Sequence, residues 1–180
     1  MKHNSAELWI DFTNALKQEI EGTHIDILGT AWESNAKRTS FYLELLLPKI
    51  ATKLNLGFER EKTFRVDATF YRKAANDYQV PIIFIETENN SSTTETEIYK
   101  LCCLNAPLKV IFICLEWNNE SRKDITEDYW QYIIDAFVAE NRLVGHLGVI
   151  VAEWMDTLKL HGFAYNEKGK IDEEKIICEI

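Results

Sequence analysis

Residues 64–88 read FRVDATFYRKAANDYQVPIIFIETE and are expected to form the centre of the fold. The first part alternates apolar and polar residues, which predicts a strand, and Ala74–Asp77 has the composition of a turn. Residues 81–85 are apolar without interruption, as in a central strand that is buried on both faces. The stretch therefore predicts a hairpin whose second strand lies inside a sheet.

Three acids are expected to meet at one end of this hairpin. Glu86 and Glu88 are two residues apart on an extended chain, so both side chains leave the same face of the sheet. Pairing of the two strands brings Asp67 within reach of them. Carboxylates at the end of a buried strand are unfavourable unless they reach solvent or a divalent cation. The pattern therefore favours a catalytic or metal-binding site.

Asp67 followed by Glu86-Thr87-Glu88 resembles the motif of the PD-(D/E)XK, or restriction-endonuclease-like, nuclease superfamily. The acid pair of that family lies on adjacent strands of a small mixed sheet. The resemblance covers roughly Glu44 to Trp117. It implies an α/β fold in which a central mixed sheet is flanked by helices, with residues 1–180 forming one domain and an N-terminal helix, residues 5–21, packed on the core.

The same resemblance implies a metal-dependent nuclease that hydrolyses phosphodiester bonds, with DNA as the expected substrate. Asp67, Glu86 and the backbone carbonyl of Thr87 would hold a Mg²⁺ or Mn²⁺ ion. Glu44 would serve a second ion if its helix turns it toward the sheet; otherwise it is a surface carboxylate.

One position departs from the family pattern, because Glu88 stands where the family usually has a lysine. Some members have an acid there, and others place a lysine on the following helix, where Lys100 stands. Either Glu88 or Lys100 would then orient or deprotonate the attacking water. The departure also supports an alternative, a catalytically inactive relative that acts as a binding or regulatory module. In a third interpretation the protein is a metal-independent interaction domain.

Apolar periodicity predicts the remaining elements. Helices are expected at 5–21, at 40–54 with a kink at Pro48, at 92–105 and from Thr126 to before Gly145; strands are expected at 58–64, 108–115 and 147–154, followed by a terminal hairpin. Residues 24–29 fit either a short edge strand or an irregular crossing. The strand–helix–strand pattern of 81–115 predicts a right-handed parallel unit, which makes Glu116 a secondary candidate at the same sheet edge.

Composition supports a single globular domain of 180 residues, because 46% of the residues are hydrophobic and only 7 are glycine and 3 proline. No signal peptide or membrane span is expected, so the protein is predicted to be cytoplasmic without a membrane partner. The four cysteines lack a Cys-x-x-Cys pair and are expected to be reduced thiols.

The net charge of −9 counts against a nucleic-acid partner, because Lys and Arg drive phosphate binding. The segment from Lys37 to Lys73 nevertheless carries nine Lys and Arg against four acids, a net charge of +5. This segment either contacts backbone phosphates or forms an ordinary solvated surface. A homodimer is a further option that the sequence leaves open.

Overall fold

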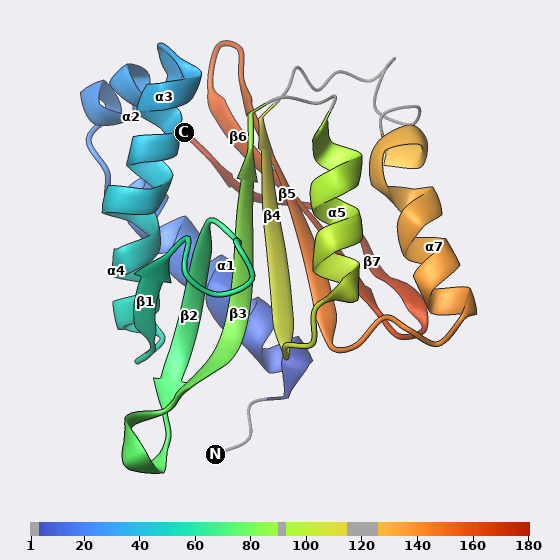
Figure 1. The fold of residues 1–180 in the computed structure, drawn as a ribbon. Helices are drawn as coiled ribbons and strands as arrows, with labels where there is room; N and C mark the ends of the chain where they lie inside the picture. Colours follow the sequence, from blue (N-terminus) through green and yellow to red (C-terminus); the bar gives the residue numbers. More distant parts are fainter. Residues whose placement is uncertain (1–3, 90–92, 115–125) are drawn as a thin grey trace.

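A computed structural model describes residues 4–89, 93–114 and 126–180. In these residues seven strands form one sheet in the order β1-β2-β3-β4-β5-β6-β7 (Figure 1). The strands are β1 (Gly57–Arg60), β2 (Ala68–Lys73), β3 (Gln79–Glu88), β4 (Leu108–Cys114), β5 (His146–Trp154), β6 (Leu158–Asn166) and β7 (Gly169–Glu179). Strands β3, β4 and β5 are parallel, and the other neighbours are antiparallel. The expected single α/β domain with a mixed sheet is confirmed.

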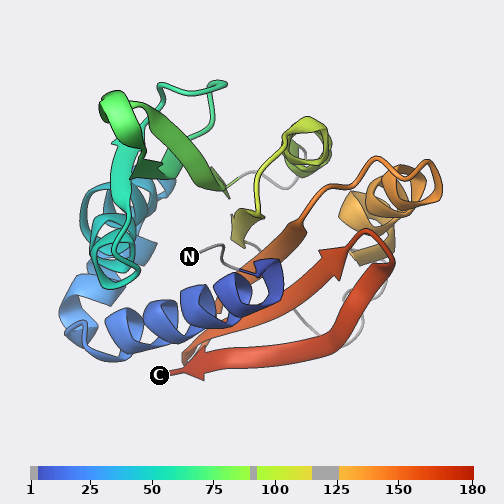
Figure 2. The same cartoon turned by 90° about the horizontal axis from the view of Figure 1, so that it is seen from below.

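Helices cover both faces of the sheet. The helical segments are α1 (Ser5–Glu21), α2 (Ile25–Trp32), α3 (Asn35–Ser40), η1 (Phe41–Leu46), α4 (Leu47–Lys53), η2 (Ala75–Asp77), α5 (Thr94–Cys103), η4 (Glu127–Gln131) and α7 (Tyr132–Ala139). Seen from below, α1 and α5 lie on opposite sides of the sheet (Figure 2). One hydrophobic cluster, which includes Phe12 and Phe112, contains side chains of α1, α2, η1 and α4. The other includes Phe84 and Trp130, together with side chains of α5 and α7.

The N-terminal helix has the bounds that the sequence predicts. Asn4 caps it, because the side-chain oxygen accepts a hydrogen bond from the Ala6 N–H at 3.1 Å. Gly148 lets the helix approach the sheet closely, since a Cβ atom there would lie 2.2 Å from Cζ3 of Trp9. The absence of a side chain at Gly148 on β5 therefore makes room for the indole ring of Trp9.

Two helical regions differ from expectation. Residues 25–32 form helix α2 rather than a strand or a crossing, because Leu28 and Ala31 are one helical turn apart and both reach the core. The helix expected from Ser40 begins instead at Asn35. The predicted disturbance by Pro48 takes the form of the π-helical segment η1, in which the Leu47 N–H donates to the Tyr42 carbonyl five residues earlier.

The strands around Asp67 are shorter than predicted. β1 ends at Arg60 and β2 begins at Ala68, so Asp67 directly precedes its strand. Between the two strands, the Val66 N–H donates to the Thr63 carbonyl at 3.3 Å and closes a tight turn. The hairpin turns predicted between β2 and β3 and near the C-terminus are confirmed.

All four cysteines are free thiols, as expected. Within the described ranges, every helix is too short or too polar to traverse a lipid bilayer.

Candidate functional site

Five of the residues selected from the sequence line one cavity of about 450 Å³, here called the acidic cavity. Its lining consists of Phe64, Arg65, Asp67, Glu86, Thr87, Glu88, Glu97 and Lys100. The cavity lies where the end of β3 meets α5 and the connection between β1 and β2, which occupies the same side of the sheet as α5 (Figure 1). Ala68 pairs with Ile85, so the preceding Asp67 comes opposite Glu86. The hairpin thus brings the two acids together as the sequence predicts.

Asp67 is held by the strand beside it. Its Oδ2 atom accepts hydrogen bonds from the backbone N–H of Thr87 at 2.8 Å and from the Thr87 hydroxyl at 2.7 Å. The backbone N–H of Asp67 donates in turn to Oε2 of Glu86 at 3.3 Å. These three contacts fix the Asp67 and Glu86 carboxylates relative to each other.

Glu86 is a buried acid with only 3% of its surface exposed. Its Oε1 atom lies 2.5 Å from Nζ of Lys100. Burial raises the pKa of Glu86 to about 8, although the hydrogen bond with Lys100 opposes the rise. The nearby carboxylates of Asp67 and Glu97 add to this increase in the pKa of Glu86. Even with the Lys100 ammonium beside it, this carboxyl group therefore favours its protonated form at neutral pH.

Lys100 brings a positive charge into the acidic cavity from helix α5. Its ammonium pairs with Glu97 as well as Glu86, and it lies 3.4 Å from the Arg65 carbonyl oxygen. Burial lowers the pKa of Lys100, but the hydrogen bonds to the two carboxylates outweigh burial and raise it above its ordinary value. The side chain therefore carries a full positive charge at neutral pH.

Glu97 was not selected from the sequence, although its spacing gave a signal. It precedes Lys100 by three residues, so the two side chains share one face of α5. Glu88, the last residue of β3, is partly buried and lines the acidic cavity with them.

Glu44 is a correction to the predicted site. Its side chain is exposed on η1 and lies 3.2 Å from Nη1 of Arg60, outside the lining of the acidic cavity. Neighbouring Leu43 and Leu46 occupy the buried side of this segment. Glu44 does not face the sheet and so cannot join Asp67 and Glu86. Glu116, the secondary candidate, lies outside the described residues.

The acidic cavity has several carboxylates in its lining, but these do not form a closed metal cage among the described residues. In the three described ranges, no group of three His, Cys, Asp or Glu side chains is arranged to hold a metal ion. Mg²⁺, however, keeps several waters and is commonly bound by one or two carboxylates. Asp67 and Glu86 are the two carboxylates that would serve a site of that type.

The basic residues of 37–73 do not form one surface at the site. Arg65 is the only one of the nine that lines the acidic cavity. Lys49 and Lys53 pair with Glu19 on α1, and Arg38 is buried. The fold thus places the basic side chains of residues 37–73 in several regions of the molecule. Of these side chains, Arg65 alone is placed to contact a phosphate at the acidic cavity.

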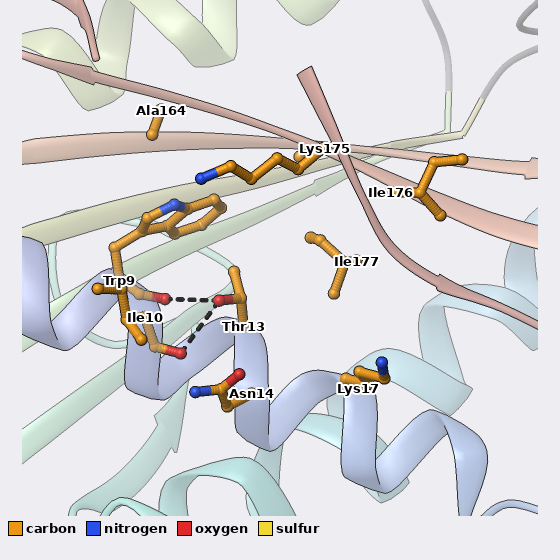
Figure 3. Close-up of a pocket in the computed structure, with 10 residues that line it drawn as sticks. Trp9, Ile10, Thr13, Asn14, Lys17, Ala164, Lys175, Ile176 and Ile177 are labelled. Atoms are coloured by element: carbon orange, nitrogen blue, oxygen red, sulfur yellow. Dashed lines mark hydrogen bonds between the residues drawn. The ribbon is translucent and has the colours of Figure 1, made fainter. Parts of the chain in front are cut away.

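A second cavity, of about 300 Å³, lies between α1 and strands β6 and β7 (Figure 3). Trp9, Ile10, Ile176 and Ile177 are the large apolar residues in its lining. No carboxylate lines it, and the Thr13 hydroxyl is already used, because it donates to backbone carbonyls of its own helix. The acidic cavity is therefore the better candidate for a catalytic site, because it contains ionisable side chains that can bind ions or transfer protons.

No known protein-family model and no curated protein matched this chain.

Proposed function

We propose that this chain is a metal-dependent nuclease that hydrolyses phosphodiester bonds, with DNA as the default substrate. The observation that supports this most is the contact between Lys100 on α5 and Glu86 on β3, in the cavity that Asp67 also lines. Two acids from adjacent strands and a lysine from the following helix are what the resemblance to PD-(D/E)XK nucleases implies.

Asp67 and Glu86, with the Thr87 carbonyl, would hold Mg²⁺ or Mn²⁺. A bound ion of this kind polarises the scissile phosphate and lowers the pKa of the attacking water. The raised pKa of Glu86 supports this assignment, because its carboxyl group stays largely protonated beside Lys100 and a bound divalent ion would favour the ionised form.

The sequence left open whether Glu88 or Lys100 acts on the attacking water, and the charge of Lys100 favours Glu88 for that role. A general base must be unprotonated, whereas the pKa of Lys100 is raised by its carboxylate partners and keeps it an ammonium. Lys100 is therefore assigned to stabilising the negative charge that develops on the phosphate, and Glu97 to positioning Lys100. Glu88 remains the candidate that orients the attacking water.

Cleavage of labelled DNA and RNA with Mg²⁺ or Mn²⁺ tests the proposal. Asp67→Asn and Glu86→Gln are each expected to reduce the cleavage rate by about 100-fold or more, because each removes a carboxylate that would hold the metal ion against the reacting phosphate. Glu95→Gln is the matched control, since Glu95 is an exposed acid on α5 outside the acidic cavity. Wild-type protein that is inactive with both ions, or activity that persists in both variants, would contradict the nuclease assignment.

The binding or regulatory module remains the second candidate, and one observation favours it. The Lys100 ammonium already pairs with Glu86 and Glu97, so an internal cation neutralises part of the acidic cavity. This candidate predicts no cleavage with any divalent ion, together with a partner retained in pull-down experiments.

A further inference from the structure

The turn before Asp67 has an unusual backbone for its residues. Phe64 and Arg65 both have left-handed φ angles, of 55° and 56°, and the turn is closed by the hydrogen bond from Val66 to Thr63. Positive φ at both central positions is the requirement of a type I′ turn, in which Asn and Gly are preferred. A phenylalanine and an arginine at these positions are strained by their side chains.

This strained turn forms one wall of the acidic cavity. Phe64 remains 64% exposed, and its ring meets the buried ring of Phe84 edge-on at 5.7 Å between centroids. Arg65 is exposed, and no acid among the described residues lies within ion-pair distance of it. Val66, next along the chain, is fully buried and anchors the turn. The backbone thus presents an aromatic ring and a guanidinium beside Glu86 and Lys100.

We infer that this turn binds substrate, and that the substrate class is single-stranded nucleic acid. An unpaired base would stack on Phe64, while Arg65 would contact the adjacent backbone phosphate. The inference rests on the proposed nuclease function and specifies its substrate.

Two physical arguments favour a single strand over a duplex. Bases inside a duplex are stacked on each other, so an exposed ring at a cavity rim can stack only on a base that is unpaired. A chain with net charge −9 and one arginine at its site also has little capacity for the phosphate contacts that dominate duplex binding. Base–aromatic stacking provides affinity that does not depend on positive charge.

Strain at the turn gives a decisive test. The double variant Phe64→Asn/Arg65→Gly installs the residues that a type I′ turn prefers, while it removes both proposed substrate contacts. We expect its Tm to rise by about 2–4 °C, the shift typical of a small stabilisation in a chain of this size. Its affinity for a single strand is expected to fall by roughly 5- to 100-fold, the range of one lost stacking contact. A lower Tm with unchanged binding would show that Phe64 is a structural anchor and would overturn the inference.

Single variants separate stacking from simple apolar contact. Phe64→Trp should bind a single strand at least as tightly as wild type, whereas Phe64→Leu should bind it several-fold more weakly. Binding is measured by fluorescence anisotropy with fluorescein-labelled 12-nucleotide DNA and RNA strands and with the corresponding blunt duplexes. Ca²⁺, which also takes oxygen ligands, is present, and gels check that the strands stay intact. Phe64-dependent binding of either the DNA or the RNA strand supports the inference and identifies the preferred chemistry.

The outcomes distinguish this inference from the proposed function. If single strands bind through Phe64 but neither Mg²⁺ nor Mn²⁺ supports cleavage, the substrate surface stands and the nuclease assignment fails. If single strands and duplexes are cleaved at equal rates, and the double variant cleaves both as wild type does, the nuclease assignment stands and the single-strand inference fails.

Discussion

Glu86 links the chemistry of the site to the stability of the protein. Its pKa is raised from 4.5 to about 8 by burial, against the opposing effect of Lys100. Between these two values the folded protein holds a proton that the unfolded chain has released. The contribution of Glu86 to stability is therefore complete below about pH 4.5, and it is lost as the pH rises toward 8.

Glu86→Gln should remove this pH dependence, because the amide does not titrate. Relative to wild type, the variant should gain stability between pH 5 and pH 9, by roughly 1–3 kcal/mol in total. Urea unfolding across this range measures the difference, with Glu95→Gln as the control that retains the wild-type slope. Parallel stability curves for wild type and Glu86→Gln would contradict the raised pKa.

Lys109 on β4 should have the opposite effect on the pH dependence of stability. It is fully buried, its ammonium donates to the Val144 carbonyl, and burial lowers its pKa to about 8 from 10.5. The unfolded chain holds more protons between these values, so wild-type stability should increase as the pH rises from 8 to 10.5. Lys109→Met should raise stability at pH 7 by about 1–3 kcal/mol and abolish that increase, as measured by urea unfolding at pH 7 and pH 10. A destabilised variant would show that the bond to Val144 outweighs burial of the charge.

At the level of single residues, the sequence predicted the part of the site that depends on strand geometry. Asp67 and Glu86 meet because opposed positions of a hairpin share a face, and Lys100 reaches them from the next helix. Glu44 was misplaced because the resemblance to the nuclease family, and not the apolar pattern, suggested that it faces the sheet. Leu43 and Leu46 occupy the buried side of this segment, and Glu44 lies beside them on the exposed side.

Helix α3 and the end of strand β3 are joined by a buried arginine. Arg38 donates to Oδ1 of Asn89 at 2.6 Å and to Oδ1 of Asn35 at 2.7 Å, and its guanidinium lies 5.7 Å from the ring centre of Trp32. Asn89 also donates to Oγ1 of Thr39 at 2.9 Å. Because Asn89 directly follows the strand that carries Glu86 and Glu88, these contacts hold the acidic end of β3 against α3.

Arg38→Leu should therefore loosen β3 as well as lower stability. Two charge-assisted hydrogen bonds are lost, and the side-chain oxygens of Asn89 and Asn35 lose their donor, which is expected to destabilise the protein by about 2–4 kcal/mol. Amide hydrogen exchange should become faster at Thr87 and Glu88. Lys37→Leu is the control, because the neighbouring Lys37 makes only an exposed ion pair with Glu33. Unchanged exchange at the end of β3 would contradict this role of Arg38.

Helix α2 and the turn before β2 were not predicted from the sequence, each for a different reason. Helix α2 is short, and its two core residues do not establish a period. The turn that carries Phe64 and Arg65 has none of the residues that normally identify a type I′ turn, so its backbone was not predictable from local preference. Conformations that oppose local preference are held by their surroundings, here by the buried Val66.

Across the whole molecule, the two hydrophobic clusters share one sheet and should unfold together. Phe12 is fully buried against Phe70 and Phe112 on one face, and Trp130 donates to the Tyr165 hydroxyl on the other.

Phe12→Ala should destabilise both faces in a single transition by about 3–5 kcal/mol, because it leaves a cavity in the α1 cluster. Far-UV circular dichroism and tryptophan fluorescence should give the same midpoint. Ile10→Ala, which alters an exposed residue of the same helix, should have little effect. Two separate transitions would show that the faces are independent.

The mixed sheet was predictable because the order of strands, helices and turns can be read along the sequence. Apolar runs joined by a helix specify parallel neighbours, and turn residues specify hairpins. The placement of charge on the surface was not predictable, because ion pairs such as Lys53 with Glu19 join segments that are distant in sequence. Net charge along a segment therefore did not predict charge on a surface.

The strand order also has a consequence for how the chain is made. In the part of the chain that the structure describes, each strand after β1 pairs with the strand synthesised before it, so the sheet can grow from one edge while the polypeptide leaves the ribosome. Helix α1 precedes every strand in the sequence, and besides α4 it packs against β5 and β7. Part of its apolar side therefore stays uncovered until β7 has been synthesised, which leaves the nascent helix exposed to chaperones and proteases until then.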